Sequence, residues 1–425
     1  MSKKKSKRKS KDLKMDKLLS QKLVDEFGEE QQRFGNEIIT KENVAEANLE
    51  YQKLFGANKN LYRVIASLQD GMKPGKRRMF YTWWLMEGRP QNTKRETLNK
   101  LHSLKVATII SQTLRLHPHG ESGIEETLSR EGQYWSNNIM TVVPQGSYGN
   151  MRGDRAAAGR YLESKLSEFT IDCFFSDFDK YCVPMKVGYD GVTLEPEFLP
   201  AKYPFILFNP QFSGIGYGNS SNIFGSNVTE VLDATIKLIK DPSAKILLIP
   251  DSPTGCDIID EGLFKEMNKT GIGKVTMRAT SEIDYVKNVI KITTLPYNGA
   301  SKDVVLKIID LINKGTIKDI AEIQDSTKEG EVDIKIFLKS SAQPDKVLDT
   351  LYKKGTGLKA VFPIGITVIE DYEEFEYGVK ELLLAWIDYR IDIVRSMFLN
   401  SLQQVETDAH MNEVLLMVFN KDDGI

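Results

Sequence analysis

A break at residues 117–120, HPHG, separates two segments in which apolar residues recur at helical spacing. The segment before the break is KLHSLKVATIISQTLRL, and the segment after it is ESGIEETLSREGQYW. Ser122 and Glu125 have the spacing of a capping box, so we expect the second helix to begin near Ser122. Two helices joined by a tight turn are typical of a helix-turn-helix, in which the second helix reads a DNA groove.

The distribution of charge supports a polyanion contact in this region. The chain has a net charge of only −2, yet residues 63–118 carry eleven Lys and Arg against three Asp and Glu. A charge run is most often a solvated face, but this one lies in a folded, aromatic-containing segment of an otherwise acidic chain, which favours a nucleic-acid surface. Residues 1–17 carry nine further Lys and Arg, and we expect residues 1–20 to be a disordered basic tail.

The remaining patterns predict a multidomain α+β protein. Strand alternation in KVTMRAT, NVIKITTLP and DIKIFLKS surrounds the amphipathic helix pattern KDVVLKIIDLINKG. After about residue 370 one long helical stripe runs through Ile387, Ile391, Val394, Phe398, Leu402 and Val405, which indicates a coiled-coil or dimer arm. The predicted domains are an N-terminal arm (21–62), a helix-turn-helix domain (63–170), a mixed α/β domain (171–370) and the helical arm (371–425).

Cysteine usage and hydropathy indicate the compartment. Cys173, Cys182 and Cys256 are odd in number and lack metal-site spacing, which predicts reduced thiols in a cytoplasmic protein. The longest apolar runs are too short to cross a bilayer, so we expect no membrane contact.

Five motifs occur in a fixed order along the chain: DGMKPGKRRMFY (70–81), HPHGES (117–122), PQGSYGNMRGDRAAAGRY (144–161), LPAKYPFILFNPQFSGIGYGNSSNI (199–223) and TLPYNGASK (294–302). With them the chain resembles the DNA breakage-reunion subunit of type IIA DNA topoisomerases, the gyrase A-like family. Within it, the chain looks most like the medium subunit of T-even-like bacteriophage topoisomerases. The resemblance implies a winged-helix DNA-gate domain at 63–170, a tower domain at 171–370 and a coiled-coil arm that stops short of a complete C-gate.

The resemblance also implies the chemistry. Tyr161 would attack a DNA phosphodiester and form a transient 5′-phosphotyrosyl bond, so that a second duplex can pass and DNA is relaxed or decatenated. Arg160 would stabilise charge on the phosphate in the transition state. A protonated phenol is a poor nucleophile, so a cation or a metal-bound base must help it lose its proton. The small residues at 156–159 suit a backbone that approaches DNA closely.

Further roles follow from the resemblance by position. Ser122 and Glu126 match drug-anchoring positions, and Ile215 matches an isoleucine that wedges between base pairs. The other DNA-contacting candidates match a basic clamp or the turn beside the cleavage centre: Arg63, Lys73, Lys76, Arg77, Arg78, His117 and His119.

The implied enzyme is an ATP-dependent type II topoisomerase that acts as a homodimer on double-stranded DNA. The chain carries no P-loop, no ATPase signature and no acidic Mg²⁺ cluster. We therefore expect partner subunits with an ATPase and a Toprim fold to bind ATP and Mg²⁺, and no metal site in this chain. In a phage-encoded protein the compartment would be the bacterial host cytoplasm.

Two other hypotheses about function involve the same residues. In a noncatalytic DNA-binding or architectural protein the helix-turn-helix would bind or bend DNA and Tyr161 would only pack. A tyrosine recombinase also uses Arg, His and Tyr, but it needs a His-x-x-Arg constellation that the His-Pro-His turn does not supply.

Overall fold

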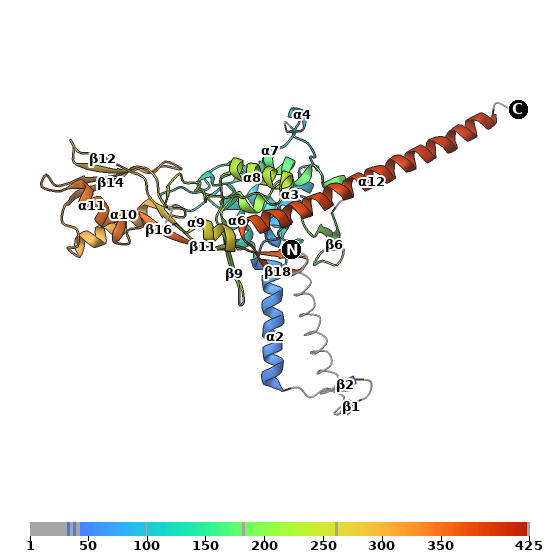
Figure 1. Cartoon of the computed structure of the whole chain (residues 1–425), viewed down its shortest axis with the longest axis horizontal. Coiled ribbons are helices and arrows are strands. Elements are labelled where there is room, and N and C mark those ends of the chain that lie inside the picture. Colours follow the sequence, from blue (N-terminus) through green and yellow to red (C-terminus); the bar gives the residue numbers. More distant parts are fainter. Residues whose placement is uncertain are drawn as a thin grey trace. The chain divides into compact units, whose positions relative to one another are not determined.

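The computed structural model describes residues 32–34, 37–39, 43–98, 100–180, 183–259 and 262–422. The chain divides into two compact units, Met1–Asn58 and Lys59–Ile425, and each is described by itself (Figure 1). The predicted basic tail, residues 1–20, and Cys182 lie outside the described residues. Cys173 and Cys256 are buried free thiols.

The described residues of the first unit form a short antiparallel hairpin and a helix. The hairpin is formed by β1 (Gln32–Phe34) and β2 (Glu37–Ile39), and the helix is α2 (Val44–Lys59). Asn43 starts the helix, because its side-chain oxygen accepts a hydrogen bond from Ala45 N at 3.0 Å.

The second unit begins with three packed helices beside a small sheet. The helices are α3 (Pro74–Met86), α5 (Val106–Thr113) and α6 (Glu121–Glu131). The antiparallel sheet has the order β3-β5-β4, with β3 (Leu104–Lys105), β4 (Val142–Gln145) and β5 (Glu163–Leu166). Trp84 of α3 stacks on Phe175 with ring centroids 4.9 Å apart, and both lie in the main hydrophobic core with Val106 of α5 and Leu128 of α6.

The expected start of the second helix near Ser122 is confirmed, since α6 begins at Glu121, but the capping box is not formed. Gly120 is the N-cap residue, and no side chain caps this helix end. The first helix begins at Val106, because Leu104 and Lys105 pair with β5 as strand β3. That pairing takes the place of the helical pattern at residues 104–105.

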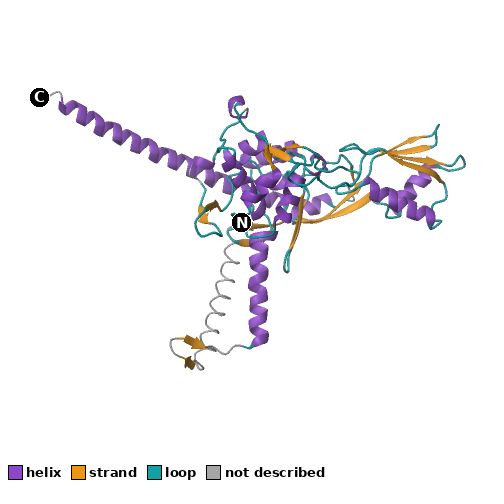
Figure 2. Ribbon diagram, turned by 180° about the vertical axis from the view of Figure 1, so that it is seen from behind, coloured by secondary structure: helices purple, strands orange, loops and turns teal. Residues whose placement is uncertain are grey.

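Short elements lie before, between and after these helices and strands, and two larger sheets complete the second unit (Figure 2). The short elements are η1 (Asn60–Val64), α4 (Arg95–Leu98), η2 (Tyr134–Ser136), α7 (Glu168–Thr170), η3 (Ile171–Phe175), η4 (Phe178–Lys180), β6 (Met185–Val187), β7 (Leu194–Pro196) and η5 (Phe205–Leu207). A sheet of order β10-β11-β16-β9-β8 follows, with α8 (Val228–Lys240) and α9 (Phe264–Thr270). Its strands are β8 (Gln211–Ile215), β9 (Ser220–Ile223), β10 (Asp257–Ile259), β11 (Ile272–Arg278) and β16 (Lys359–Gly365).

A four-stranded antiparallel sheet forms a second hydrophobic core. Its order is β12-β13-β15-β14, and α10 (Ser301–Asn313) and α11 (Pro344–Lys353) pack on it. Ile290 and Ile336 face each other across β13 and β15 and are fully buried. The strands are β12 (Ser281–Asp284), β13 (Val289–Ile292), β14 (Ile320–Asp325) and β15 (Ile334–Leu338). The mixed α+β class and the strands and helix predicted here are confirmed.

The chain then forms a hairpin and a long helix. The hairpin consists of β17 (Thr367–Glu370) and β18 (Glu373–Glu376), so the helical arm does not begin near residue 371 but with α12 (Val379–Asp422). Ile387 is buried in the main core, whereas Phe398, Leu402 and Val405 of the same stripe are exposed in the single chain. No helix in the described part of the chain has both the length and the apolar character needed to span a membrane.

Glu87, at the end of α3, is a buried carboxyl group with an unusual pKa. Burial raises the pKa of Glu87 to about 7, although the carboxylate accepts a hydrogen bond from Leu166 N at 3.1 Å. In the unfolded chain this group loses its proton near pH 4.5. Folding therefore binds a proton between these two values, and the stability that protonated Glu87 contributes below about pH 4.5 is lost as the pH rises through about 7.

Glu87→Gln is expected to raise the free energy of unfolding at pH 8 by about 1–3 kcal/mol, because an amide keeps the acceptor and removes the buried charge. Near pH 5 the difference from the parent protein should be much smaller. Urea unfolding of both proteins at the two pH values measures this. An equal difference at both values would show that Glu87 does not titrate as described.

Candidate functional site

The loop that carries Arg160 and Tyr161 is fixed to the first turn of α5. Gly159 O accepts a hydrogen bond from Ala107 N at 3.1 Å, and Leu162 O accepts one from Val106 N at 3.0 Å. Leu162 is buried in the main core and leads into β5. The backbone is therefore held on both sides of the Arg160-Tyr161 pair, and both members of the pair are exposed to solvent.

Glu125 of α6 holds the same loop from a second helix. Its Oε1 atom accepts a hydrogen bond from Gly159 N at 3.3 Å. A Cβ atom at position 159 would lie 3.2 Å from Val106 Cγ1 and 3.3 Å from Ala107 N, so glycine permits this close approach. The sequence pattern assigned Glu125 to a helix cap, and nothing local to it signals that it positions the loop.

Arg160 and Tyr161 are available for chemistry. Tyr161 is 65% exposed, and the guanidinium carbon of Arg160 lies 4.8 Å from the centre of its ring. A cation over an aromatic face is attracted by the ring quadrupole. The contact places a fixed positive charge beside an accessible phenol, which suits attack on a phosphate whose oxygens need neutralisation.

The HPHG turn forms a compact pair of neutral imidazoles. His117 and His119 pack edge to face with ring centroids 4.8 Å apart. Burial, with help from His119, Arg78 and Arg63, lowers the pKa of His117 to about 4, and burial and the same two arginines lower the pKa of His119. Arg78 Nη1 donates to His117 Nδ1 at 3.5 Å, which leaves the proton of the neutral ring on Nε2.

The basic segment at 73–78 is mostly not an exposed surface. Arg77 is buried, and its guanidinium binds both carboxylate oxygens of Asp70 at 2.6 and 3.0 Å. Lys76 Nζ lies 2.6 Å from Glu131 Oε1, and Arg78 makes two bonds to Glu195, at 2.6 and 2.8 Å. The expectation that Lys76, Arg77 and Arg78 are exposed cations is therefore wrong.

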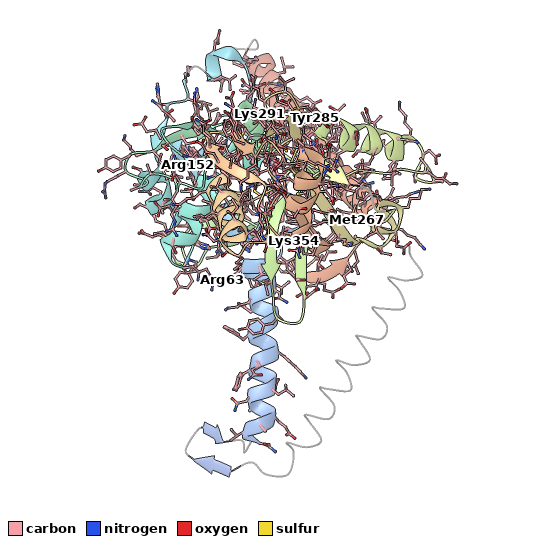
Figure 3. All side chains as sticks on the ribbon, turned by 90° about the vertical axis from the view of Figure 1, so that its left-hand side faces the viewer. Arg63, Arg152, Met267, Tyr285, Lys291 and Lys354 are labelled. Carbon is pink, nitrogen blue, oxygen red and sulfur yellow. The ribbon has the colours of Figure 1, made fainter. Side chains whose placement is uncertain are left out.

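Lys73 and Arg63 occupy different environments. Burial lowers the pKa of Lys73, whereas Arg63 is exposed on the surface of the second unit (Figure 3). Both line a cavity of about 270 Å³ behind α6, together with Lys76, His117 and Arg130. Of the five basic candidates at 63–78, Arg63 is thus the one with the most accessible charge.

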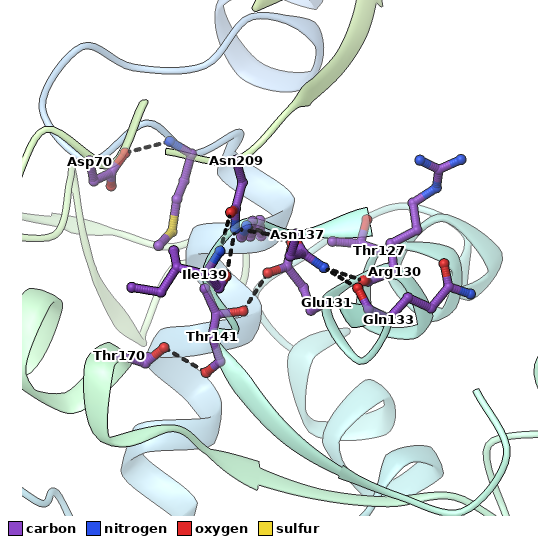
Figure 4. Close-up of polar contacts among 12 residues, drawn as sticks. Asp70, Thr127, Arg130, Glu131, Gln133, Asn137, Ile139, Thr141, Thr170 and Asn209 are labelled. Atoms are coloured by element: carbon purple, nitrogen blue, oxygen red, sulfur yellow. Dashed lines mark hydrogen bonds and ion pairs between the residues drawn. The ribbon is translucent and has the colours of Figure 1, made fainter. Parts of the chain in front are cut away.

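The inner side of α6 is fixed by a buried polar network (Figure 4). Asn137 Nδ2 donates to the carbonyl oxygens of Arg130 and Gln133 at the end of the helix. Asn209 Nδ2 donates to Asn137 Oδ1 at 3.2 Å, and Glu131 accepts a hydrogen bond from Thr141. These contacts hold α6 rigidly, and its exposed side presents Ser122 and Glu126 to solvent.

The Ile215 side chain is 82% exposed at the end of strand β8. An isolated isoleucine with this exposure contributes little to a core, and its position at the end of the β8–β9 hairpin leaves it free to contact another molecule.

Arg77 and Arg63 allow a direct test of structural against surface charge. Arg77→Gln is expected to lower the free energy of unfolding by about 3–5 kcal/mol, because it leaves the buried Asp70 carboxylate without its cation. Arg63→Gln should change stability by less than about 0.5 kcal/mol. It should instead reduce the log-log salt slope of DNA binding by about 0.9, the value for one lost phosphate contact. Urea unfolding and binding titrations measure both, and a stable Arg77→Gln protein with a reduced slope would contradict this assignment.

The acidic groups near Tyr161 are engaged with the protein. Glu163 Oε1 lies 2.6 Å from Lys105 Nζ, Glu125 binds Gly159 N, and Asp154 closes a turn with Asn150. Within the described ranges no group of three or more His, Cys, Asp or Glu side chains is placed to hold a metal ion. These side chains do not fit a Mg²⁺ site, which needs convergent carboxylates.

Comparison with known proteins gives one consistent relationship. The sequence profile of a family described as the A subunit of DNA gyrase/topoisomerase IV matches residues 63–425. The A subunit of DNA gyrase from Chlamydia muridarum is 30% identical over 400 residues, 92% of this chain and 47% of that protein. The A subunit of DNA topoisomerase 4 from Streptococcus pneumoniae is 30% identical over 367 residues, 84% of this chain and 43% of that protein.

The A subunit of DNA gyrase from Leptospira biflexa is 31% identical over 376 residues, 85% of this chain and 43% of that protein. The chain thus spans somewhat less than half the length of these curated relatives. The profile match covers most of the chain and includes the Arg160-Tyr161 loop, α5 and α6. The chain therefore belongs to the family formed by the A subunits of DNA gyrase and topoisomerase IV.

Proposed function

We propose that this chain is the DNA breakage-reunion subunit of a type II DNA topoisomerase and that Tyr161 is its nucleophile. One observation carries the proposal: in a chain of this family, Tyr161 is exposed beside the Arg160 guanidinium on a loop fixed to two helices. An exposed tyrosine with a cation against its ring fits attack on an anionic phosphodiester better than it fits core packing.

The proposed reaction exchanges one phosphodiester for another. The Tyr161 hydroxyl oxygen loses its proton and attacks the phosphorus, the bond from phosphorus to the 3′-oxygen breaks, and that oxygen takes up a proton. Arg160 binds the equatorial oxygens of the phosphorus as their charge grows. The reverse attack by the 3′-hydroxyl reseals the strand, since the phosphotyrosyl bond keeps the bond energy.

We propose that the DNA-contacting surface includes the Arg160-Tyr161 loop and the elements around it. Helices α5 and α6 with the sheet β3-β5-β4 would form the winged-helix DNA gate of residues 63–170, with Arg63, His117 and His119 near the backbone of the duplex. Ile215 would enter between base pairs and bend the duplex. Ser122 and Glu126, on the exposed side of α6, would be the anchoring positions for drugs that bind the cleaved complex.

The proposed assembly has several chains. Residues 171–370 would form the tower domain, and the exposed apolar residues in the second half of α12 would form the coiled-coil arm of a homodimer. Partner subunits with a Toprim fold and an ATPase would bind Mg²⁺ and ATP. We further propose that the enzyme is cytoplasmic and related to the medium subunit of T-even-like phage topoisomerases.

The proposal is tested by trapping the covalent intermediate. The chain is mixed with end-labelled duplex DNA, Mg²⁺ and a gyrase B-type or topoisomerase IV B-type subunit, and the mixture is denatured rapidly. Peptide mapping should locate the 5′-phosphate on Tyr161. DNA binding and bending without any covalent adduct would instead favour a noncatalytic architectural protein.

A further inference from the structure

The β8–β9 hairpin ends in a short loop that carries two exposed side chains. Ile215 pairs with Ser220 as the last residue pair of the hairpin, and residues 216–219 form the loop between them. Ile215 is 82% exposed and Tyr217 is 55% exposed. The hairpin projects from the second unit, as Figures 1 and 2 show, so its tip needs its own means of support.

Asn60 supplies that support through the loop backbone. Its Oδ1 atom accepts a hydrogen bond from Tyr217 N at 2.9 Å, and its Nδ2 atom donates to Tyr217 O at 3.0 Å. Asn60 is only 2% exposed. A buried amide that bonds both polar groups of one residue fixes that residue as a neighbouring strand would.

Glu374 of β18 orients the Asn60 amide and binds the other side of the loop. Its Oε1 atom accepts from Asn60 Nδ2 at 2.8 Å, and its Oε2 atom accepts from Asn219 Nδ2 at 2.9 Å. Asn219 O in turn accepts a hydrogen bond from Gly216 N at 2.9 Å. One carboxylate thus ties two amides together, and hydrogen bonds to a charged acceptor are stronger than neutral ones.

The glycines on either side of Ile215 allow the hairpin to reach this position. A Cβ atom at Gly216 would lie 2.2 Å from Asn60 Oδ1, and one at Gly214 would lie 2.3 Å from Val64 O. Asn60 and Val64 begin and end η1, a single π-helical turn, a geometry that is rare and frequent at functional sites. The hairpin therefore lies close against η1 at both glycines, while the Ile215 side chain between them remains largely exposed.

We propose that Asn60, oriented by Glu374, is a positioning residue that fixes where Ile215 enters DNA. The inference rests on the wedge role proposed above for Ile215. Unstacking a base step costs free energy, and a hairpin whose tip moves freely would deflect or would lose conformational entropy on binding. The hydrogen bonds that Asn60 and Glu374 make to the loop, called here the Asn60–Glu374 clamp, restrict the motion of the hairpin tip in the free protein.

Asn60→Asp tests the clamp because it replaces the amide donor by a second carboxylate facing Glu374. In the full chain, hydrogen exchange at the amides of Gly216 and Tyr217 should become at least about tenfold faster. DNA bending, measured by energy transfer between duplex ends, should fall, and cleavage with the partner subunit should drop by roughly tenfold or more. DNA affinity should stay within about threefold, because most binding energy comes from phosphate contacts.

Glu374→Gln in the same chain provides the rescue. The introduced amide can donate to the new carboxylate at position 60 and can still accept from Asn219, so exchange, bending and cleavage should all recover in part. Asn92→Asp is the matched control, since this exposed side chain only accepts hydrogen bonds, from Lys94 N and Thr97 Oγ1, and a carboxylate keeps both.

The outcomes separate the clamp from the wedge. Ile215→Ala should reduce bending without changing exchange at Tyr217. Normal bending by Ile215→Ala would overturn the wedge, and with it the positioning role. If Ile215→Ala reduces bending but Asn60→Asp changes neither exchange nor bending, the clamp alone is overturned. Faster exchange with normal bending and cleavage would overturn the positioning role, as would a failure of Glu374→Gln to rescue.

Discussion

Tyr161→Phe is expected to abolish covalent DNA adducts and strand passage while DNA affinity changes by no more than about threefold. The substitution removes only the nucleophilic oxygen, and one exposed hydroxyl contributes about 0.5 kcal/mol to binding, at the low end for a hydrogen bond. The ring stays in place, so the contact with Arg160 and the path of the loop between β4 and β5 are preserved. Denaturing gels of end-labelled DNA measure the adduct, and relaxation of supercoiled plasmid measures strand passage.

Tyr189→Phe is the matched control for this experiment. Tyr189 is 75% exposed on the turn between β6 and β7, so its hydroxyl can be removed without disturbing the core. The Tyr189→Phe protein should cleave DNA as the parent protein does. A covalent adduct formed by the Tyr161→Phe protein would remove Tyr161 from the reaction.

The isolated chain is expected to bind DNA yet to form no adduct at any Mg²⁺ concentration. Cleavage should appear only when a Toprim-bearing partner is added with Mg²⁺, and strand passage only after ATP is added as well. The reason is local: Glu163, Glu125 and Asp154, the acidic side chains beside the Arg160-Tyr161 loop, already bind Lys105, Gly159 N and Asn150. Releasing any one of them for a metal would break the contact that it makes.

A titration of Mg²⁺ with and without the partner, scored by adducts on denaturing gels, measures this dependence. The Tyr161→Phe protein with partner and Mg²⁺ is the control for cleavage by contaminants. Tyr161-dependent cleavage by the chain alone would show that the nucleophile and its cation site are not divided between subunits.

Several elements could be predicted from the sequence because their signals are local. The strand and helix patterns between residues 274 and 340 appear as β11, β13, α10 and β15, since alternation and helical spacing report directly which face is buried. The exposed Arg160-Tyr161 pair was also predicted, because small residues precede it and a motif shared with a known family contains it.

The long helix α12 shows what a local sequence pattern does not determine. The apolar residues from Ile387 to Val405 do lie on one long helix, as predicted. The pattern does not specify which part of the chain or which other chain packs against them. Ile387 packs in the main core of this chain, whereas Phe398 and Val405 are exposed in the single chain. The start of the helix was also displaced, from about 371 to Val379, because β18 pairs with β17 in the segment where the helical pattern was assigned.

The sequence by itself determined the family, the strand and helix patterns of β11, β13, α10 and β15, and the two residues proposed for the chemistry, since each depends on motifs or periodicities of neighbouring residues. Only the tertiary structure decided which charged side chains are exposed and which are buried against a partner. Arg78 meets Glu195 across 117 residues, and Asn60 meets Glu374 across 314. A count of local charge cannot include such partners, because the free energy of a buried charge depends on the group that packing brings against it. The sequence therefore predicts a DNA-binding surface at residues 73–78, whereas in the folded chain most of these cations are buried in ion pairs.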